Sequence, residues 1–473
     1  MHCGYVTTLK DVRPHPNADK LVLATCFVNT VCVNKEMYHE GEIGVYFPVD
    51  LQLSMEFCQK NGLLAVYENG KNVSGGYMDP AKRNVKAIKL RGEQSDGLFL
   101  PLSCLAYTGV NLDELELNSP ITVVNGHEIC RKYIPRGKPQ ATAAGGAGKR
   151  AKRKAKRSIA PVFYEHIDTE QLAYNLHMFK PGDLIEITRK LHGTSARTSH
   201  TKVFQGMKRT FWDKLFRREG TPIYDWGYVS GTRRTVLDTF DGGFYGSNEF
   251  RKPYHDFFEG KLLKGETVYY EIVGFTHEGQ PIMGVCNNKK LNDKEFVKKY
   301  GETTTFSYGC APGIQYELEF NEQGDVVNRI PFYHKNDIYV YRMTMTNEDG
   351  EVVEYTPDQM RHRCMYMGVK TVPLHWYGFI PENPGSKEDD TISAGEWVLN
   401  KAEQFYDGEE PIDPTHIREG VVVRVINRPT FTAYKHKNFQ FKVLEGIIKE
   451  NAEAPDMEEA DGLDEEDTEA ETV

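Results

Sequence analysis

Short apolar runs separated by turn residues fill the first 135 positions of the chain. Four of these runs are LVLATCFV at 21–28, IGVYFPV at 43–49, VKAIKL at 85–90 and GLFLPL at 97–102. Turn-forming segments such as HPNAD and RGEQSDG lie between them. Short strands that alternate with turn signals predict a small all-β barrel over residues 1–135.

Residues 161–450 carry both strand-like and helix-like patterns. The strand-like runs lie at 183–188, 267–275, 337–345 and 419–426. Apolar residues recur at helical spacing at 209–218, 294–300 and 394–406. This mixture predicts one α+β domain.

Two breaks in composition bound this domain. Residues 136–160 contain nine basic and no acidic residues, with mostly Ala and Gly between them, so they have no apolar face to bury. We expect a flexible basic linker there, either a solvated tether or a contact to a nucleic-acid backbone, and a nuclear targeting run if the host has a nucleus. Residues 451–473 hold eleven acidic residues and no Lys or Arg, which is typical of a disordered tail.

The charge of the whole chain is therefore a poor guide to its surface. The formal net charge of −10 becomes +1 when the eleven acidic residues of the tail are removed, so the folded part can carry basic patches.

No apolar run approaches about 18 residues, and the N-terminus has no apolar signal core, so we expect neither a membrane span nor secretion by a signal peptide. Nine cysteines without a CxxC pair predict free thiols in a reducing, cytoplasmic environment.

A lysine at the end of a strand is the first candidate for chemistry. Lys190 closes an apolar run in ITRKLHGTSAR and is followed by a turn at His192 and Gly193. A lysine held beside a tight turn becomes a nucleophile when burial or neighbouring cations lower its pKa. Taken alone the pattern is weak, and a surface lysine before a turn is the simpler interpretation.

Two further strands carry polar or aromatic side chains in apolar surroundings. Glu271 lies in mid-strand in GETVYYEIVGF and shares one face with Tyr269 and Val273, because side chains alternate along a strand. A carboxylate there needs a partner, which is an ion pair, a sugar hydroxyl or a metal ion. Tyr339 and Tyr341 share a face of NDIYVYRMTM, either as core residues or as an exposed ring that stacks on a purine base.

The last two segments bring together a carboxylate and two ammonium groups. Glu419 begins the Val-rich run REGVVVRVI beside a glycine, where it is either a solvated strand end or a ligand for Mg²⁺. Lys435 and Lys437 project from one face of AYKHK. Two neighbouring ammonium groups repel unless an anion such as a triphosphate lies between them. The alternative is a basic edge strand that faces solvent.

The order of these segments resembles that of the covalent nucleotidyltransferases, the family of ATP-dependent ligases and RNA capping enzymes. KLHGTS at 190–195 is similar to the motif with the nucleophilic lysine, and KxHG in place of KxDG favours the RNA ligases. The family's strand glutamate, stacking aromatic, metal ligand and lysine pair have counterparts here in the same order, and a GTRR run at 231–234 precedes them. The resemblance covers nearly all of residues 161–446.

The resemblance implies an adenylyltransferase domain of antiparallel sheets with flanking helices, an ATP substrate and a Mg²⁺ or Mn²⁺ ion. A lysine would form a lysyl-AMP intermediate, AMP would pass to a 5′-phosphate, and a 3′-OH would then seal the nick. The implied catalytic residues are Lys190, Glu271, Lys435 and Lys437, and the implied metal ligand is Glu419. The implied nucleotide contacts are Lys190, His192, Gly193, Arg233, Glu271, Tyr341, Lys435 and Lys437.

Two residues depart from the family pattern. Arg189 precedes the nucleophile where RNA ligases often have an acidic residue, which puts the usual contact to the adenine edge in question. Either the nucleotide preference is altered, or a backbone contact replaces the usual side-chain contact to the adenine. Arg342 follows Tyr341 where many relatives have Asp, which is a milder change.

The N-terminal segment resembles the OB-fold of tRNA-binding modules. The matching stretches are HPNADKL at 15–21, GEIGVYFPVD at 41–50 and KAIKLRGEQSDGLFLPL at 86–102. An OB domain ahead of the catalytic domain resembles a branch of RNA ligases that seals nicks with an RNA 3′-OH strand. The implied partner is a nicked duplex with RNA on the 3′-OH side, and no obligate protein partner is evident. The candidate nucleic-acid contacts, which are otherwise solvated surface residues, are Arg13, Lys20, Lys86, Lys89 and Arg91.

Two other functions stay open at this stage. A GTP-dependent capping-type nucleotidyltransferase would share the motifs, but the residues that follow Lys437 are too few for the OB domain that such enzymes and DNA ligases carry behind the catalytic domain. A non-catalytic RNA-binding protein on a ligase scaffold would not need the complete set of motif residues.

Overall fold

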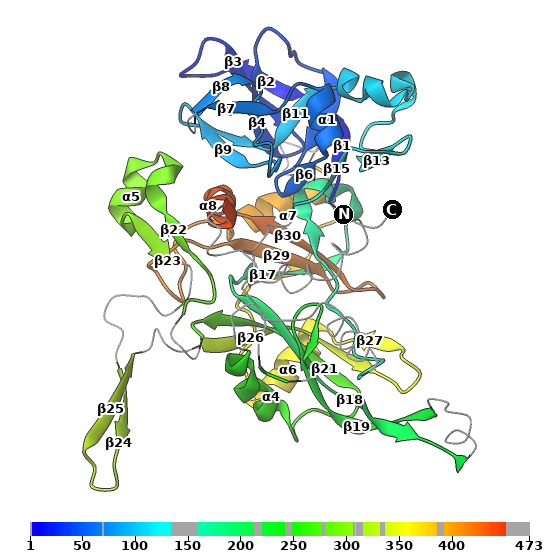
Figure 1. Ribbon diagram of the computed structural model, residues 1–473, viewed down its shortest axis with the longest axis vertical. Coiled ribbons are helices and arrows are strands. Elements are labelled where there is room, and N and C mark those ends of the chain that lie inside the picture. Colours follow the sequence, from blue (N-terminus) through cyan, green and yellow to red (C-terminus); the bar gives the residue numbers. More distant parts are fainter. Residues whose placement is uncertain are drawn as a thin grey trace.

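The computed structural model describes residues 2–68, 71–133, 159–211, 220–237, 239–241, 248–276, 280–305, 308, 316–331, 336–385 and 392–450. These residues form an N-terminal β-rich domain and a larger α+β domain below it (Figure 1). Most of the predicted basic linker, the acidic tail and most of the predicted helix at 209–218 lie outside the described residues. Within the described part, no helix is long and apolar enough to cross a membrane.

Paired strands build the N-terminal domain. They are β1 (Gly4–Thr8), β2 (Lys10–Pro14), β3 (Leu21–Cys26), β4 (Asn29–Asn34), β5 (Ile43–Phe47), β6 (Leu51–Leu53), β7 (Ala65–Glu68), β8 (Lys71–Gly75), β9 (Ala87–Leu90), β10 (Glu93–Asp96), β11 (Leu98–Pro101), β12 (Pro120–Ile121), β13 (Val123–Val124), β14 (His127–Glu128) and β15 (Cys130–Lys132), together with helix α1 (Met55–Lys60). Two antiparallel sheets have the orders β11-β5-β1-β12 and β2-β3-β4. Alternate side chains of their strands, such as Val6, Val45 and Phe47, are fully buried, as the short apolar runs predict.

Two larger sheets form the second domain. Its strands are β16 (Glu170–Gln171), β17 (Leu184–Lys190), β18 (Thr194–Lys208), β19 (Thr221–Gly231), β20 (Val236–Leu237), β21 (Glu266–Gly274), β22 (Val285–Asn287), β23 (Thr303–Thr305), β24 (Tyr316–Phe320), β25 (Val326–Pro331), β26 (Asn336–Thr346), β27 (Val352–Glu354), β28 (Leu374–Phe379), β29 (Gly420–Val425) and β30 (Thr432–Lys437). Its helices are α4 (Lys252–Phe258), α5 (Lys294–Tyr300), α6 (Pro357–Met367), α7 (Ala394–Glu403) and α8 (Phe439–Glu450). The sheet orders are β16-β30-β29-β17-β28 and β20-β19-β18-β21-β26-β27.

The five-stranded sheet has one apolar and one charged face. Ile187 and Val423 lie opposite each other in the ladder and pack against Val398 of α7. Lys190 lies opposite Gly420, and Gly420 lies opposite Lys437 on the next strand. Because side chains alternate along each strand, the two lysines share the face that α7 leaves uncovered.

Helices α4 and α6 cover one face of the six-stranded sheet. Phe258 of α4 and Met360 of α6 join Tyr270 and Ile272 of β21 in the largest apolar core. The residues that alternate with this core, including Glu271, therefore point to the opposite face. Helices α4, α6 and α7 therefore do not cover the charged faces of the two sheets, where the candidate site residues lie.

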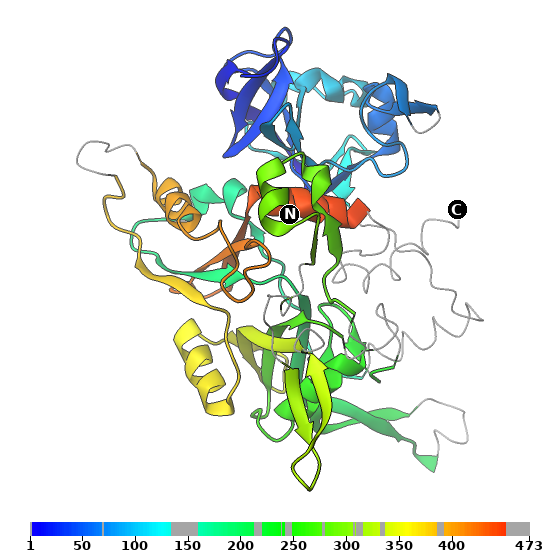
Figure 2. The same ribbon diagram turned by 90° about the vertical axis from the view of Figure 1, so that its left-hand side faces the viewer.

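Helix α8 lies between the N-terminal domain and the five-stranded sheet in both views (Figures 1 and 2). Among the described residues, ion pairs join the domains between Lys442 of α8 and Asp96 at 2.5 Å and between Lys89 and Asp293 at 2.8 Å. Tyr174, which follows β16, packs its ring 5.1 Å from that of Tyr5 on β1. These contacts fix the N-terminal domain on the second domain.

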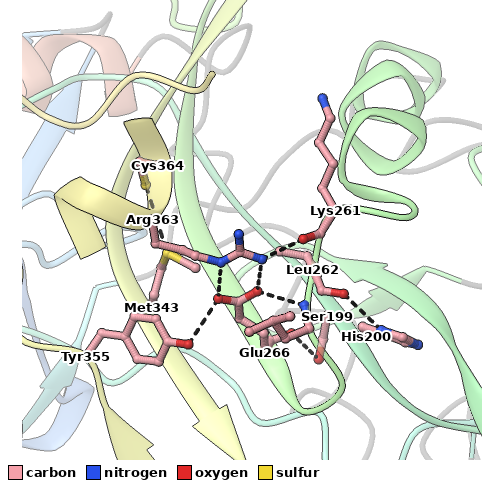
Figure 3. Close-up of polar contacts among 10 residues, drawn as sticks. Ser199, His200, Lys261, Leu262, Glu266, Met343, Tyr355, Arg363 and Cys364 are labelled. Atoms are coloured by element: carbon pink, nitrogen blue, oxygen red, sulfur yellow. Dashed lines mark hydrogen bonds and ion pairs between the residues drawn. The ribbon is translucent and has the colours of Figure 1, made fainter. Parts of the chain in front are cut away.

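A buried carboxylate anchors α6 to the six-stranded sheet (Figure 3). Glu266 at the start of β21 is fully buried and accepts two hydrogen bonds of 2.8 Å from the guanidinium of Arg363. Its oxygens also accept hydrogen bonds from the Tyr355 hydroxyl at 3.0 Å and from the backbone N–H of Leu263 at 2.9 Å. A buried charge is tolerated only when it is paired and hydrogen-bonded in this way.

We predict that Glu266→Ala lowers the free energy of unfolding by about 3 kcal/mol or more, because it leaves the charge of Arg363 without its buried partner. Urea unfolding of both proteins measures the difference. Glu348→Ala is the control, since the side chain of Glu348 is 69% exposed and its removal should change stability little. Equal effects of the two substitutions would contradict this role of Glu266.

Candidate active site

A cluster of buried charges forms where β17, β29 and β30 meet. Nζ of Lys190 lies 2.8 Å from Oε1 of Glu419, and Nζ of Lys437 lies 3.3 Å from the same oxygen. The Glu419 side chain is only 1% exposed, whereas that of Lys190 is 26% exposed. The candidate nucleophile thus reaches solvent from one side while a buried carboxylate holds it from the other.

Glu419 stays ionised in this position. Burial alone would raise its pKa, but the ammonium groups of Lys190 and Lys437 hold that pKa well below its usual range. Nδ1 of His192 lies 3.5 Å from Oε2 of Glu419. The His192 ring also packs edge-on against Phe441 of α8, with 4.7 Å between the ring centroids. His192 therefore contacts the carboxylate directly.

Lys435 lies on the same face as Lys437, as the sequence predicts. Burial, together with the nearby charges of Lys437, Lys190 and Arg233, lowers the pKa of Lys435 to about 8. Several cations therefore gather in one place, beside the carboxylate of Glu419. Such a site favours a ligand with several negative charges.

The chain turns tightly between Lys190 and β18. A side chain at Gly193 would bring its Cβ within 2.3 Å of the backbone oxygen of Ile272, so only glycine fits there. The same Cβ would lie 3.0 Å from Cγ of Glu271. In the ladder, Glu271 lies opposite Ser195 on one side and Tyr339 on the other. The half-buried Glu271 is thereby brought next to the turn that follows Lys190.

A β-bulge in β26 places Tyr341. The register of β21 with β26 shifts so that Tyr269 pairs with Arg342 and Tyr270 pairs with Val340, which leaves Tyr341 as the extra residue. Its hydroxyl lies 2.5 Å from Oγ of Ser195. The half-buried Tyr341 ring packs edge-to-face against His166, with 5.0 Å between centroids. Burial and neighbouring arginines keep the pKa of His166 well below its usual value, so this ring is neutral at pH 7.

Arg233 lies close to this group. It forms an ion pair with Asp168, and its backbone oxygen accepts a hydrogen bond from Arg197. The charge of Arg233 contributes to the lowered pKa of Lys435. The structure thus brings together the candidates Lys190, His192, Gly193, Arg233, Glu271, Tyr341, Glu419, Lys435 and Lys437.

The two residues that depart from the family pattern both have partners inside the domain. Arg189 points to the face of β17 opposite Lys190 and forms a buried ion pair of 2.8 Å with Glu410. Its side chain is therefore directed away from the nucleophile. Arg342 is buried, pairs with Glu354 and lies over the Tyr269 ring at 4.6 Å.

The candidate nucleic-acid contacts differ in their exposure. Arg13, Lys20 and Arg91 are exposed, whereas Lys86 is half-buried. Lys89 is directed to the domain interface, where its ion pair with Asp293 leaves its side chain 19% exposed. The Lys89 ammonium group thus contacts the second domain, and its role in nucleic-acid binding stays a prediction.

Sequence reasoning missed several residues of the site. Glu445 of α8 binds Nζ of Lys437 with both oxygens, at 2.8 and 2.7 Å. Ser195, His166 and Asp168 complete the surroundings of Tyr341 and Arg233. No sequence motif indicated Glu445, whereas Ser195 lies inside KLHGTS and could have been included.

The composition of the site fits a polyphosphate and a loosely held metal ion. Among the described residues there is no cluster of three or more His, Cys, Asp or Glu side chains that would form a protein cage around a metal. Mg²⁺ and similar ions do not need one, because they usually bind one or two carboxylates and keep water or substrate phosphates as their other ligands. Glu419 is a carboxylate of this kind, beside the cations that would hold the phosphates.

Comparisons with known proteins agree with this architecture. A family model described as an OB-fold domain matches residues 4–102. A search of curated proteins by sequence finds no match. The N-terminal domain is thus OB-like, as the sequence predicts.

Solved structures of the RNA ligase of Naegleria gruberi share the fold. A variant with a lysine replaced by methionine, solved with AMP and manganese, aligns with 14% sequence identity and a TM-score of 0.52 over 93% of this chain and 98% of that chain. A lysine-to-alanine variant with ATP and manganese gives a TM-score of 0.51, and the ligase with pyrophosphate gives 0.50, both at 14% identity and the same coverage. The chain therefore has the two-part fold of that RNA ligase, which confirms the predicted fold class.

We predict that Glu419→Gln lowers the free energy of unfolding at pH 7 by about 2 kcal/mol, because the ammonium groups of Lys190 and Lys437 lose the carboxylate that pairs with both of them. The folded-state pKa of Glu419 lies well below the usual value of 4.5, so its contribution to stability is fully present above about pH 4.5 and is lost as the pH falls through the folded-state pKa. Urea unfolding at pH 7 and at successively lower pH should show that the difference in free energy of unfolding between wild type and Glu419→Gln becomes smaller. A gap that does not change with pH would disprove the assignment.

Proposed function

We propose that the protein is an ATP-dependent RNA ligase that seals 3′-OH/5′-phosphate nicks through a lysyl-AMP intermediate on Lys190. The observation that carries this proposal is the buried cluster of Lys190, Glu419, Lys435 and Lys437 at one end of the five-stranded sheet. The shared fold with a ligase solved with ATP, AMP and pyrophosphate supports it.

Lys435 and Lys437 would bind the α-phosphate of ATP. Their positive charges lie where negative charge builds on the non-bridging oxygens during displacement at phosphorus, and such preorganised cations stabilise the transition state. Arg233, whose charge acts on Lys435, would serve as a ribose or phosphate contact. Tyr341 would stack on the adenine, with His166 supporting its ring from the side.

Lys190 is the proposed nucleophile. Its neutral amine would attack the α-phosphorus, a new N–P bond would form, and the bond to the pyrophosphate leaving group would break. The ion pair with Glu419 would favour the charged ammonium, which is not nucleophilic. A divalent cation held by Glu419 would compete for this carboxylate and disfavour the ammonium by charge repulsion.

Two further displacements would complete the reaction. The 5′-phosphate of the nick would attack the phosphorus of the lysyl-AMP, which releases Lys190 and joins AMP to the RNA end. The 3′-OH would then attack the 5′-phosphorus, and AMP would leave. Glu271, beside the turn that follows Lys190, would hold the ribose or a hydrated metal ion.

Exposed cations of the N-terminal domain would hold the duplex that flanks the nick. Arg13 lies near the end of β2, Lys20 in the turn that follows, and Arg91 in the turn between β9 and β10. Hydrogen bonds join these two parts of the chain. His15 bonds the backbone oxygen of Leu90 at 3.0 Å, and Asn17 donates to that of Arg91 at 3.0 Å. Exposed cations gathered by joined loops are suited to phosphate contacts.

The test of the proposed function is covalent labelling. With ATP labelled at the α-phosphate and Mg²⁺ or Mn²⁺, the wild type should retain label after denaturation and Lys190→Ala should retain none. Lys202→Ala, which removes a lysine from β18, is the matched control and should label like the wild type. Label from GTP alone would favour a capping-type enzyme, and no label from either nucleotide would favour a non-catalytic RNA-binding protein.

We predict that the triple variant Arg13→Ala, Lys20→Ala, Arg91→Ala seals nicked duplex at least tenfold more slowly at low duplex concentration, while self-labelling stays unchanged. Each lost phosphate contact should also reduce the slope of log affinity against log salt by about 0.9. Duplex binding at several salt concentrations and single-turnover sealing measure these effects. Unchanged affinity would remove this surface from the proposal.

A further inference from the structure

Lys437 is held from two sides by carboxylates of different origin. Glu419 comes from the strand next to it, whereas Glu445 comes from α8, beyond the end of the sheet. Glu445 binds the Lys437 ammonium with both oxygens at 2.8 and 2.7 Å, and its side chain is only 9% exposed. Of its two carboxylate partners, Lys437 thus lies closer to Glu445 of the helix than to Glu419.

The same helix contacts the N-terminal domain. Lys442 lies three residues before Glu445, one helical turn away, so both side chains leave neighbouring parts of the α8 surface. Its ammonium pairs with Asp96 at 2.5 Å, and both side chains are largely buried, at 16% and 9% exposure. Phe441 and Leu444 hold α8 in the largest apolar core. Helix α8 therefore bridges Asp96 of one domain and Lys437 of the other.

Stability alone does not account for a buried ion pair at this place. Removing two charges from water costs free energy that their attraction often fails to recover, so an apolar pair would serve a purely structural purpose equally well. A long, flexible lysine does, however, need fixed partners if its ammonium is to be aimed at one point. Glu445 gives Lys437 such a partner, at a fixed place on a rigid helix.

We infer that Glu445 is a positioning residue for Lys437, and that the N-terminal domain controls this positioning through the Asp96–Lys442 contact with α8. The inference rests on the proposed function, in which Lys437 binds the α-phosphate. Docking of the N-terminal domain would then set how well the active site stabilises the transition state. RNA held by that domain would act on chemistry through α8.

The first experiment measures lysyl-AMP formation in single turnovers of the full chain over a range of ATP concentrations. Glu445→Gln should lower the rate constant at saturating ATP tenfold or more and change the half-saturating ATP concentration less than twofold. The reason is that a misplaced Lys437 ammonium group weakens stabilisation of the transition state more than it weakens binding of ATP. Glu445→Asp, which keeps the carboxylate, should recover part of the rate. The control Glu348→Gln changes an exposed glutamate and should behave like the wild type.

The second experiment tests the link to the N-terminal domain. Asp96→Asn and Lys442→Gln should each lower the same rate constant at least threefold, and the double variant should be no slower than the slower single variant. Asn29→Ala is the control, because it removes the interdomain hydrogen bond to the Tyr174 hydroxyl, which involves no residue of α8, and its rate constant should stay unchanged. Equal losses in all three single variants would mean that docking in general matters, which overturns the route through α8.

The outcomes separate this inference from the proposed function. No label on the wild type would overturn both. Label on the wild type with an unchanged rate constant in Glu445→Gln would overturn the inference and leave the ligase proposal standing. A Glu445→Gln protein that labels fewer molecules at the wild-type rate has only lost folded protein, which also overturns a positioning role.

Discussion

One buried carboxylate, Glu419, makes the rest of the site possible. Without it, Lys190 and Lys437 would place two positive charges within a few ångströms of each other inside the protein, and like charges at that distance would repel strongly. The lysines in turn keep Glu419 ionised by holding its pKa well below the usual range. The cluster is therefore a balanced unit, and a polyanionic ligand or a metal ion changes that balance when it binds.

Backbone geometry delivers these charges to one place. Gly420 separates Lys190 from Lys437 in the ladder, so two lysines from different strands share one face with no side chain between them. The six-stranded sheet comes close to this cluster because Gly193 packs against the backbone of Ile272, and the bulge at Tyr341 changes the direction of that side chain. Bulges and close approaches of this kind are common beside active sites, because they re-aim side chains that a regular strand would point elsewhere.

The division into two domains adds a second level of control. Among the described residues, the ion pairs Lys89–Asp293 and Lys442–Asp96 and the packing of Tyr5 on Tyr174 hold the N-terminal domain against the second domain. Helix α8 takes part in this interface and in the charge cluster at once, through Lys442 and Glu445. A surface that binds nucleic acid and a site that transfers a nucleotide would thus share one helix.

The sequence alone determined the alternating strands, the α+β class, the helix at 294–300, most of the helix expected at 394–406, which ends at Glu403, and the positions of the motif residues, because periodicity and local motifs are properties of short segments. The sequence also contains a pattern that indicates the start of α6, the capping box formed by Thr356 and Gln359, which our sequence analysis did not use. Only the tertiary structure could decide that Arg189 points away from Lys190, that Lys89 joins the domains, and that Glu445 holds Lys437. Those partners lie on separate elements of the chain, and the distances between such elements are set by packing, which no local pattern records.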